Sequence, residues 1–380
     1  MYTMKDRTES QRHVSDVLVY LALLCFGVNY ILYNALGIEQ YKTVLRVLGV
    51  FFVLAKWVMS RKTKVTIMQA VLLVASLVAF LINGVESMNL IVLVIIGIVI
   101  GTDDKAATKI YIVNVILLLL VALLFLVGFM NNNVWYGGTE VVRKTRWTLG
   151  FRNPNHATAF FTSFFCLYLL TRMKLSKWHI IVALSLEVIV YYLTDSRTWF
   201  ISFLVFSLVL FIMLYTDRFR NAIQNICIIG VDFLFIIHLF LQFIIKYLMN
   251  FDTLLSFRIS RFQSELSGFG LKEFLFGGGR VSVDSVYINL LYGYGFFVYI
   301  IVWIAVHTAM KNLKEGSNYK TIAFITAMFI AGTMESSTIR PEFMSSIIVW
   351  NILMNNCQHY KRTVLESNND LDDVKAHNTM

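Results

Sequence analysis

Arginine residues placed between apolar segments are the feature of this sequence best suited to chemistry. In "YYLTDSRTWFISF", residues 191–203, Arg197 separates two runs of apolar residues. Further arginines stand in other polar segments of the chain: Arg152, Arg258, Arg261, Arg280 and Arg340. A guanidinium group keeps its charge at physiological pH and binds phosphate through two parallel hydrogen bonds. These residues therefore favour an anionic, phosphate-bearing ligand.

The elements that must position these arginines are predicted first from composition. Of the 380 residues, 58% are hydrophobic, 15% are charged and only 2 are proline, whereas a soluble domain carries about 25% charged residues. This composition predicts an all-α, polytopic integral membrane protein in which residues 1–380 form a single transmembrane domain. The four cysteines have no paired spacing and no companion histidines, so they predict neither a disulfide nor a metal site.

About twelve apolar segments are candidate membrane-spanning helices, which need about 20 residues each. The segments are roughly 14–33, 41–59, 65–83, 87–101, 110–130, 156–171, 179–194, 198–215, 223–245, 284–309, 321–335 and 343–357. The segments on either side of "TDSRT" are separate helices only if these residues form a tight turn.

The distribution of Lys and Arg predicts the orientation of these segments. With the N-terminus in the cytoplasm, every inner loop is short and basic, while the outer loops at 34–40 and 84–88 contain no Lys or Arg. Cytoplasmic loops carry an excess of these residues. Both termini are therefore expected in the cytoplasm, and Arg197 on the outer face. Residues 361–380 form a polar tail that is predicted to be disordered.

Two long outer loops, about 131–155 and 246–283, depart from this rule because they are rich in arginine. In the second loop, apolar residues recur at helical spacing from Leu248 to Phe269 and predict an amphipathic helix on the membrane surface. Arg258 and Arg261 lie on one face of that helix. A run of three glycines, Gly277 to Gly279, then allows close approach of the backbone to a ligand, although three glycines alone are weak evidence for phosphate binding.

A few ionisable residues stand inside the apolar segments. Such residues usually mark a pathway or an ion pair. We expect Glu187 and Asp232 to pair across helices with Arg46 or His238, and we favour this structural role over a proton relay.

The outer arginines also have an ordinary structural interpretation. Each could contact lipid phosphates or pair with a nearby carboxylate, the candidates being Glu140, Asp195, Glu265 and Glu335. For a set spread over every outer loop between the fifth and twelfth apolar segments, we favour a ligand presented from the membrane. A lipid-linked pyrophosphate has the required charge and location.

The order of several short motifs resembles the O-antigen and capsular polysaccharide polymerase family, often called Wzy, which shares a superfamily with the O-antigen ligases. The motifs are "GFRNPNHATAFF", "DSRTWFIS" and "RISRF" followed by "LFGGG", an aspartate and an apolar helix with Gly293 and Gly295. They cover about residues 145–300. Members of the ligase branch have a histidine where this chain has Asp284 and Ser285, which favours a polymerase.

The resemblance implies an enzyme of the outer face of the bacterial plasma membrane. It would join undecaprenyl-pyrophosphate-linked oligosaccharide repeat units into O-antigen or capsule, without a cofactor or a metal. The family's functional residues are external arginines, and by motif these become Arg152, Arg197, Arg258, Arg261 and Arg280. The expected partners are lipid-linked glycans, the lipid bilayer and, by analogy, a regulator of chain length, with no nucleic acid.

The residues give this reaction a concrete form. Arg197, Arg258 and Arg261 are expected to hold the pyrophosphate, Arg152 and Asn155 to line the same cleft, and Arg280 and Arg340 to contribute further charge. Candidate general bases are Asp284, then Glu335, then His156. Direct attack on one face of the sugar predicts inversion at the anomeric carbon. Asp284 and Glu335 are equally placed to be structural partners of Arg280 and Arg340.

Two alternatives remain open from the sequence. A flippase for lipid-linked oligosaccharide would share about twelve helices, but it is expected to line a central cavity with charge. An O-antigen ligase would differ from a polymerase in transferring the glycan to lipid A core or to a protein.

Overall fold

The computed structural model describes residues 4–60, 65–100, 105–135, 145–252, 258–279, 281 and 283–357. The predicted tail at 361–380 and Arg280 lie outside these residues. The major helices are α1 (Met4–Ile31), α2 (Lys42–Ser60), α3 (Ile67–Asn83), α4 (Met88–Ile100), α5 (Ala106–Leu126), α6 (Pro154–Thr171), α7 (Lys177–Thr194), α8 (Arg197–Tyr215), α9 (Asp217–Leu239), α14 (Phe296–Glu315), α15 (Tyr319–Ala331) and α16 (Met344–Asn356). Shorter elements are η1 (Leu32–Leu36), η2 (Gly84–Ser87), β1 (Val134–Trp135), β2 (Arg146–Trp147), α10 (Leu241–Leu248), η3 (Met249–Phe251), α11 (Arg258–Leu266), α12 (Leu271–Phe276), α13 (Val286–Ile288), η4 (Asn289–Gly293) and η5 (Ser337–Ile339).

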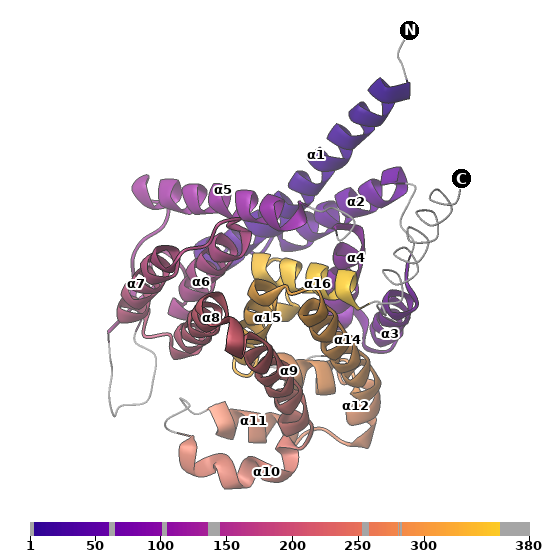
Figure 1. The fold of residues 1–380 in the computed structure, drawn as a ribbon. Helices are drawn as coiled ribbons and strands as arrows, with labels where there is room; N and C mark the ends of the chain where they lie inside the picture. The colour runs from indigo at the N-terminus through magenta and orange to yellow at the C-terminus, as the bar shows by residue number, and fades with distance from the viewer. Residues whose placement is uncertain are drawn as a thin grey trace, which may run out of the picture.

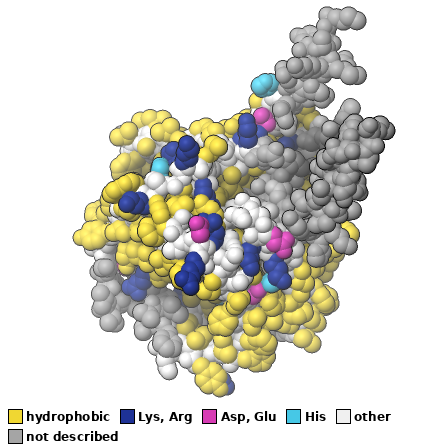
Figure 2. Space-filling model, in the orientation of Figure 1, with side chains coloured by type: hydrophobic (Ala, Val, Ile, Leu, Met, Phe, Trp, Pro, Cys, Tyr) yellow, Lys and Arg dark blue, Asp and Glu magenta, His cyan; other side chains and the backbone are white. Residues whose placement is uncertain are grey.

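The all-α prediction is confirmed. Apart from the two-residue strands β1 and β2, the regular structure of the described residues is helical. Among the described residues, six helices are long and apolar enough to cross a membrane: His13–Leu36, α5, α7, α8, α9 and α14. On the face in view, hydrophobic side chains cover much of the margin of the described residues, while most Lys and Arg side chains lie farther in (Figure 2). Such a broad apolar perimeter is typical of a membrane protein.

The centre of the bundle is formed by α15 and α16 (Figure 1). Helix α15 packs against α8 and α9, and α16 packs against α4 and α14. Small residues permit this close packing, as at Gly97 of α4, where an added Cβ would lie 2.7 Å from the carbonyl oxygen of Trp350. In a membrane, where lipid is as apolar as leucine, close approach at small residues is a main source of helix association.

The tight turn predicted at "TDSRT" is confirmed. Helix α7 ends at Thr194 and α8 begins at Arg197. Asp195 adopts a left-handed conformation with φ 49°, which aspartate tolerates better than most residues because its short side chain can hydrogen-bond locally. The turn presents Arg197 on the surface as the first residue of α8.

Two predictions for the region after residue 245 hold only in part. The amphipathic helix expected from Leu248 to Phe269 is shorter than predicted: α11 buries Ile259, Phe262 and Leu266 and exposes Arg261, while Leu248 is the last residue of α10. The apolar segment expected at 284–309 is broken before α14 by Gly295, with φ +99°. The break arises because the backbone of glycines 277–279 packs against the chain just before Gly295. The amide of Gly278 donates a hydrogen bond to the Tyr292 carbonyl oxygen at 2.6 Å.

The glycine run is therefore a packing element in this structure. An added Cβ at Gly277 would lie 2.5 Å from the Gly293 carbonyl oxygen. The close approach that the three glycines permit is made to the chain's own backbone, and the hypothesis of a phosphate loop receives no support from this geometry.

Gly295→Ala is expected to destabilise the protein. A Cβ at this position would lie 2.7 Å from the Leu275 carbonyl oxygen. The alanine would also have to adopt a φ of +99°, a backbone strain that costs about 1–3 kcal/mol. Thermal unfolding of the purified protein in detergent measures the effect. Gly230→Ala is the matched control, because an added Cβ there meets nothing within 4 Å. Equal melting temperatures for the two variants would contradict this assignment.

The expected pairs among ionisable residues inside the apolar segments are also wrong. Arg46 of α2 forms an ion pair with Glu342, which lies just before α16. Asp232 of α9 accepts hydrogen bonds from Trp303 and His307 of α14, each at 2.8 Å. The reason is helix adjacency: α9 packs on α14, and Asp232 lies at that interface.

Candidate functional site

Glu335 is the centre of the candidate site. It lies in the connection between α15 and α16 and is buried. Its Oε1 accepts hydrogen bonds from Arg258 Nη2 at 3.1 Å and from Asn155 Nδ2 at 3.4 Å. Arg258 Nη1 also donates to the carbonyl oxygen of Met334. This carboxyl group therefore joins the first residue of α11 to the first turn of α6.

Arg146 connects Asn155 to the end of α7. Its Nη2 donates to Asn155 Oδ1 at 2.8 Å, and its Nε donates to the carbonyl oxygen of Thr194 at 2.7 Å. The Thr158 hydroxyl donates to the Thr194 hydroxyl at 2.8 Å, so α6 and α7 are held together beside it. Asn155 thus stands between an arginine on one side and a carboxyl group on the other.

Arg197 lies within electrostatic range of these groups. Burial lowers the pKa of Arg146; Asp195 opposes this shift, while the charges of Arg258 and Arg197 add to it. We call Arg146, Arg197 and Arg258 the inner arginine cluster. Three like charges repel one another at short range, so such a cluster is stabilised by anionic groups. Asp195 and Glu335 partly supply that charge, and an anionic ligand would supply more.

The environment of Glu335 raises its pKa to about 7. Burial is the largest cause, because it disfavours the charged form. Asp284 raises the pKa further, while Arg258 and Arg340 lower it. A carboxyl group with this pKa exchanges a proton near neutral pH, which is the property of an efficient general base.

Asp284 and Arg340 form the more exposed side of the site. Arg340 Nη2 lies 3.6 Å from Asp284 Oδ1, and both side chains are close to half exposed. Ser336 bridges them, since its hydroxyl accepts a hydrogen bond from Arg340 at 2.8 Å and donates to Asp284 at 3.5 Å. Arg340 and Asp284 both act electrostatically on Glu335, so this pair belongs to the same site.

Arg152 and His156 lie beside the site, and neither side chain contacts Glu335 directly. Arg152 Nη1 is 3.7 Å from Glu39 Oε1, in an exposed pair. His156 is largely buried, and its Nδ1 has no hydrogen-bond partner within the described part of the chain. Electrostatic interactions join His156 to Arg340, Asp284 and Arg152. Of the candidate bases, Glu335 is therefore the one that contacts the inner arginine cluster directly.

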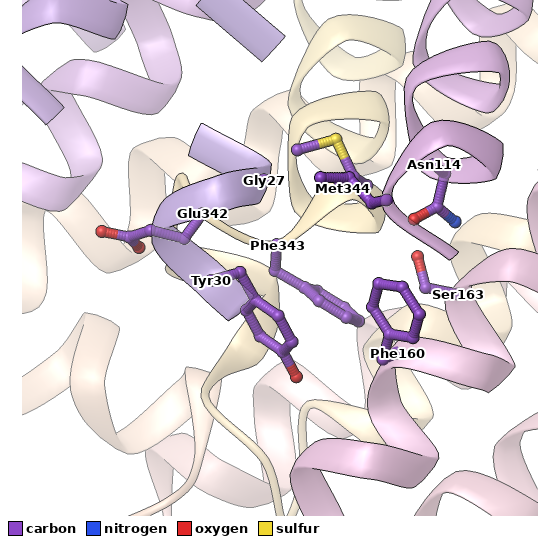
Figure 3. Close-up of a pocket in the computed structure, with 9 residues that line it drawn as sticks. Gly27, Tyr30, Asn114, Phe160, Ser163, Glu342, Phe343 and Met344 are labelled. Carbon is purple, nitrogen blue, oxygen red and sulfur yellow. The ribbon is translucent and has the colours of Figure 1, made fainter. Parts of the chain in front are cut away.

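Aromatic side chains pack beside His156, at the edge of the site. Tyr30 donates from its hydroxyl to the His156 carbonyl oxygen at 2.9 Å, and its ring centroid lies 5.9 Å from that of Phe343 and 6.3 Å from that of Phe160. The three rings border a cavity of about 10 Å³, with the Tyr30 hydroxyl pointing away from Asn114 (Figure 3). A space of this size holds at most a water molecule, so the three rings are closely packed beside His156.

The structure brings together most of the site residues predicted from the sequence. Asn155, Arg197, Arg258, Asp284, Glu335 and Arg340 are connected by the contacts and electrostatic interactions above, and His156 and Arg152 border them. Arg261 lies on the exposed face of α11, and Arg258 supplies the contacts to Glu335. Arg280 lies outside the described residues. Among the described residues, no group of three or more His, Cys, Asp and Glu side chains could hold a metal ion.

Arg146 is a site residue that the sequence-based prediction did not include. The sequence identifies it only as one of several basic residues in the segment 131–155. Its position follows from the pairing of β1 with β2, in which Trp135 faces Arg146. That pairing directs the chain back toward Asn155 and Thr194.

The signature of a family described only as a domain of unknown function, DUF8712, matches residues 1–158. The match includes Arg146, Asn155 and His156 but ends before Arg197. No curated protein and no solved structure matches the chain.

Proposed function

We propose that this protein is a membrane glycosyltransferase that polymerises lipid-linked oligosaccharide repeat units into a surface polysaccharide, O-antigen or capsule. The donor and acceptor are undecaprenyl-pyrophosphate-linked glycans at the outer face of the bacterial plasma membrane. The observation that carries the proposal is the convergence of Arg146, Arg197 and Arg258 around Asn155 and Glu335. Guanidinium groups gathered from separate segments suit a diphosphate.

The proposed topology has about twelve spans, with both termini in the cytoplasm. Each of the apolar segments predicted from the sequence contains or overlaps one of the major helices, including those too short to be recognised as spans by length alone. In this topology the start of α6, the α7–α8 turn and the α15–α16 connection all face outward. The site residues stand on these same ends, and the external segments 131–155 and 246–283 contribute Arg146 and Arg258.

The proposed reaction is a direct displacement. The acceptor hydroxyl oxygen attacks the anomeric carbon of the donor, and the bond from that carbon to the diphosphate oxygen breaks. The electron pair remains on the departing lipid diphosphate, where the inner arginine cluster stabilises the developing charge. Glu335 accepts the proton of the attacking hydroxyl. Attack opposite the leaving group inverts the anomeric configuration.

Analysis of lipid-linked products in a deletion strain tests this function. We expect loss of the polymerase to leave single repeat units on their lipid carrier at the outer face, and the wild-type gene to restore long glycan. Repeat units retained at the inner face would instead indicate a flippase. Long polymer that stays on its lipid carrier would indicate a ligase. Unchanged surface polysaccharide would overturn all three assignments.

A further inference from the structure

An apolar groove lies between α3 and α14, on the side of the bundle that is exposed to its surroundings. Its volume is about 620 Å³, within the usual range of ligand sites, about 300–1,000 Å³. The lining side chains are all hydrophobic and include Ala70, Val74, Ala75, Phe276 and Val298. An exposed hollow of this kind is suited to a hydrocarbon chain.

The shape of the groove follows from the residues of α3. Ala70, Ala75 and Ala79 are small and leave space where larger side chains would fill the gap to α14. Val74 stands between them with 59% of its surface exposed. Helix α12 covers one end of the groove, where Asn83 Nδ2 donates to the Phe276 carbonyl oxygen at 2.9 Å. The hollow is therefore built into the packing of three helices.

The groove approaches the charged site through Tyr294. This residue lines the groove, and its phenol interacts electrostatically with Arg46 and Arg340. Arg340 in turn acts on Glu335. Apolar and cationic surfaces thus meet at Tyr294, an arrangement that complements an amphiphile with a hydrocarbon chain and an anionic head.

We propose that the groove holds the polyisoprenoid chain of the acceptor, with its diphosphate directed toward Arg46 and Arg340, while the departing diphosphate of the donor lies at the inner arginine cluster. The identity of this occupant rests on the proposed function. In this position the lipid enters from the bilayer between α3 and α14, and its head group reaches the side of the site that carries Arg340 and Asp284.

Photolabelling tests the proposal. The full-length protein in lipid nanodiscs is exposed to undecaprenyl diphosphate carrying a photoreactive diazirine in its isoprenoid chain, and labelled peptides are mapped by mass spectrometry. We expect labels on α3 and α14. Ala75→Trp and Val74→Trp each fill the groove and should reduce this labelling about tenfold, equivalent to about 1.4 kcal/mol of binding. Ala122→Trp, on the exposed side of α5, is the matched control and should label as the wild type does.

Three results would overturn the groove assignment. Labels confined to other helices would do so, as would equal labelling of the Ala75→Trp, Val74→Trp and Ala122→Trp variants. Labelling of the groove by a photoreactive phosphatidylglycerol that excess undecaprenyl diphosphate does not reduce would assign the groove to ordinary membrane lipid.

Polymer analysis in cells separates this proposal from the proposed function. If Arg197→Ala abolishes long glycan while Ala75→Trp changes neither labelling nor glycan, the groove assignment fails and the polymerase assignment stands. If the isoprenoid labels the groove but deletion of the gene leaves surface glycan unchanged, the polymerase assignment fails and the groove remains a site for a lipid diphosphate.

Discussion

Arg197→Ala is expected to abolish long surface glycan while the protein remains in the membrane at its normal level. Arg197 is exposed at the start of α8, so truncation leaves the core of the bundle unchanged. It removes one of the cations of the inner arginine cluster. Loss of one preorganised group that stabilises transition-state charge costs about 10²–10³-fold in rate. Gel analysis of surface polysaccharide, with immunoblotting of membranes, measures both quantities.

Two further variants sharpen this prediction. Arg197→Lys keeps the charge but loses the planar pair of donors, and we expect it to fail as well if the diphosphate is bound by two parallel hydrogen bonds. Arg220→Ala is the matched control, because Arg220 pairs with Asp217 on α9, away from the cluster. Glycan of normal length in the Arg197→Ala strain would exclude Arg197 from the active site.

The positions of the helices were largely predictable because they depend on local properties of the chain. A run of apolar residues of sufficient length forms a helix wherever backbone groups cannot reach water. The α7–α8 turn was predictable for the same local reason, since "TDSRT" interrupts the apolar run with residues that favour turns. The break at Gly295 was not, because it depends on backbone contacts with the distant glycines 277 and 278.

The membership of the candidate site was predictable only in part. Arginines that depart from the predicted distribution of Lys and Arg drew attention to the segments between apolar runs. These segments contain Arg197, Arg258 and Arg340. The partners of each arginine depend on tertiary packing. Arg46 meets Glu342 from the far end of the chain, and Arg146 reaches Asn155 only because β1 pairs with β2. Neither contact leaves a periodic pattern in the sequence.

Glu335→Gln is expected to lower the polymerisation rate by about 10²–10⁴-fold, the usual contribution of a general base. Glutamine retains a side-chain oxygen that can accept the hydrogen bond from Arg258 Nη2, so the position of that arginine is preserved while proton acceptance is lost. Initial rates with purified protein and lipid-linked repeat units measure the effect. A variant with nearly normal activity would assign Glu335 the role of orienting Arg258.

The pH dependence of the rate tests the same role independently. Burial raises the pKa of Glu335 to about 7, and only the ionised carboxylate accepts a proton. The wild-type rate should therefore fall about tenfold for each pH unit below 7 and level off above it. The rate of the Glu335→Gln variant should not show this fall below pH 7.

Asp284→Asn provides the control for the pH profile. The charge of Asp284 contributes to the raised pKa of Glu335. Without this charge, the rate should still fall at low pH, but the midpoint of the fall should move to lower pH. The reason is that a second negative charge no longer opposes the ionisation of Glu335. Loss of this fall in Asp284→Asn, with its retention in Glu335→Gln, would transfer the role of base to Asp284, beside Arg340 at the exposed side of the site.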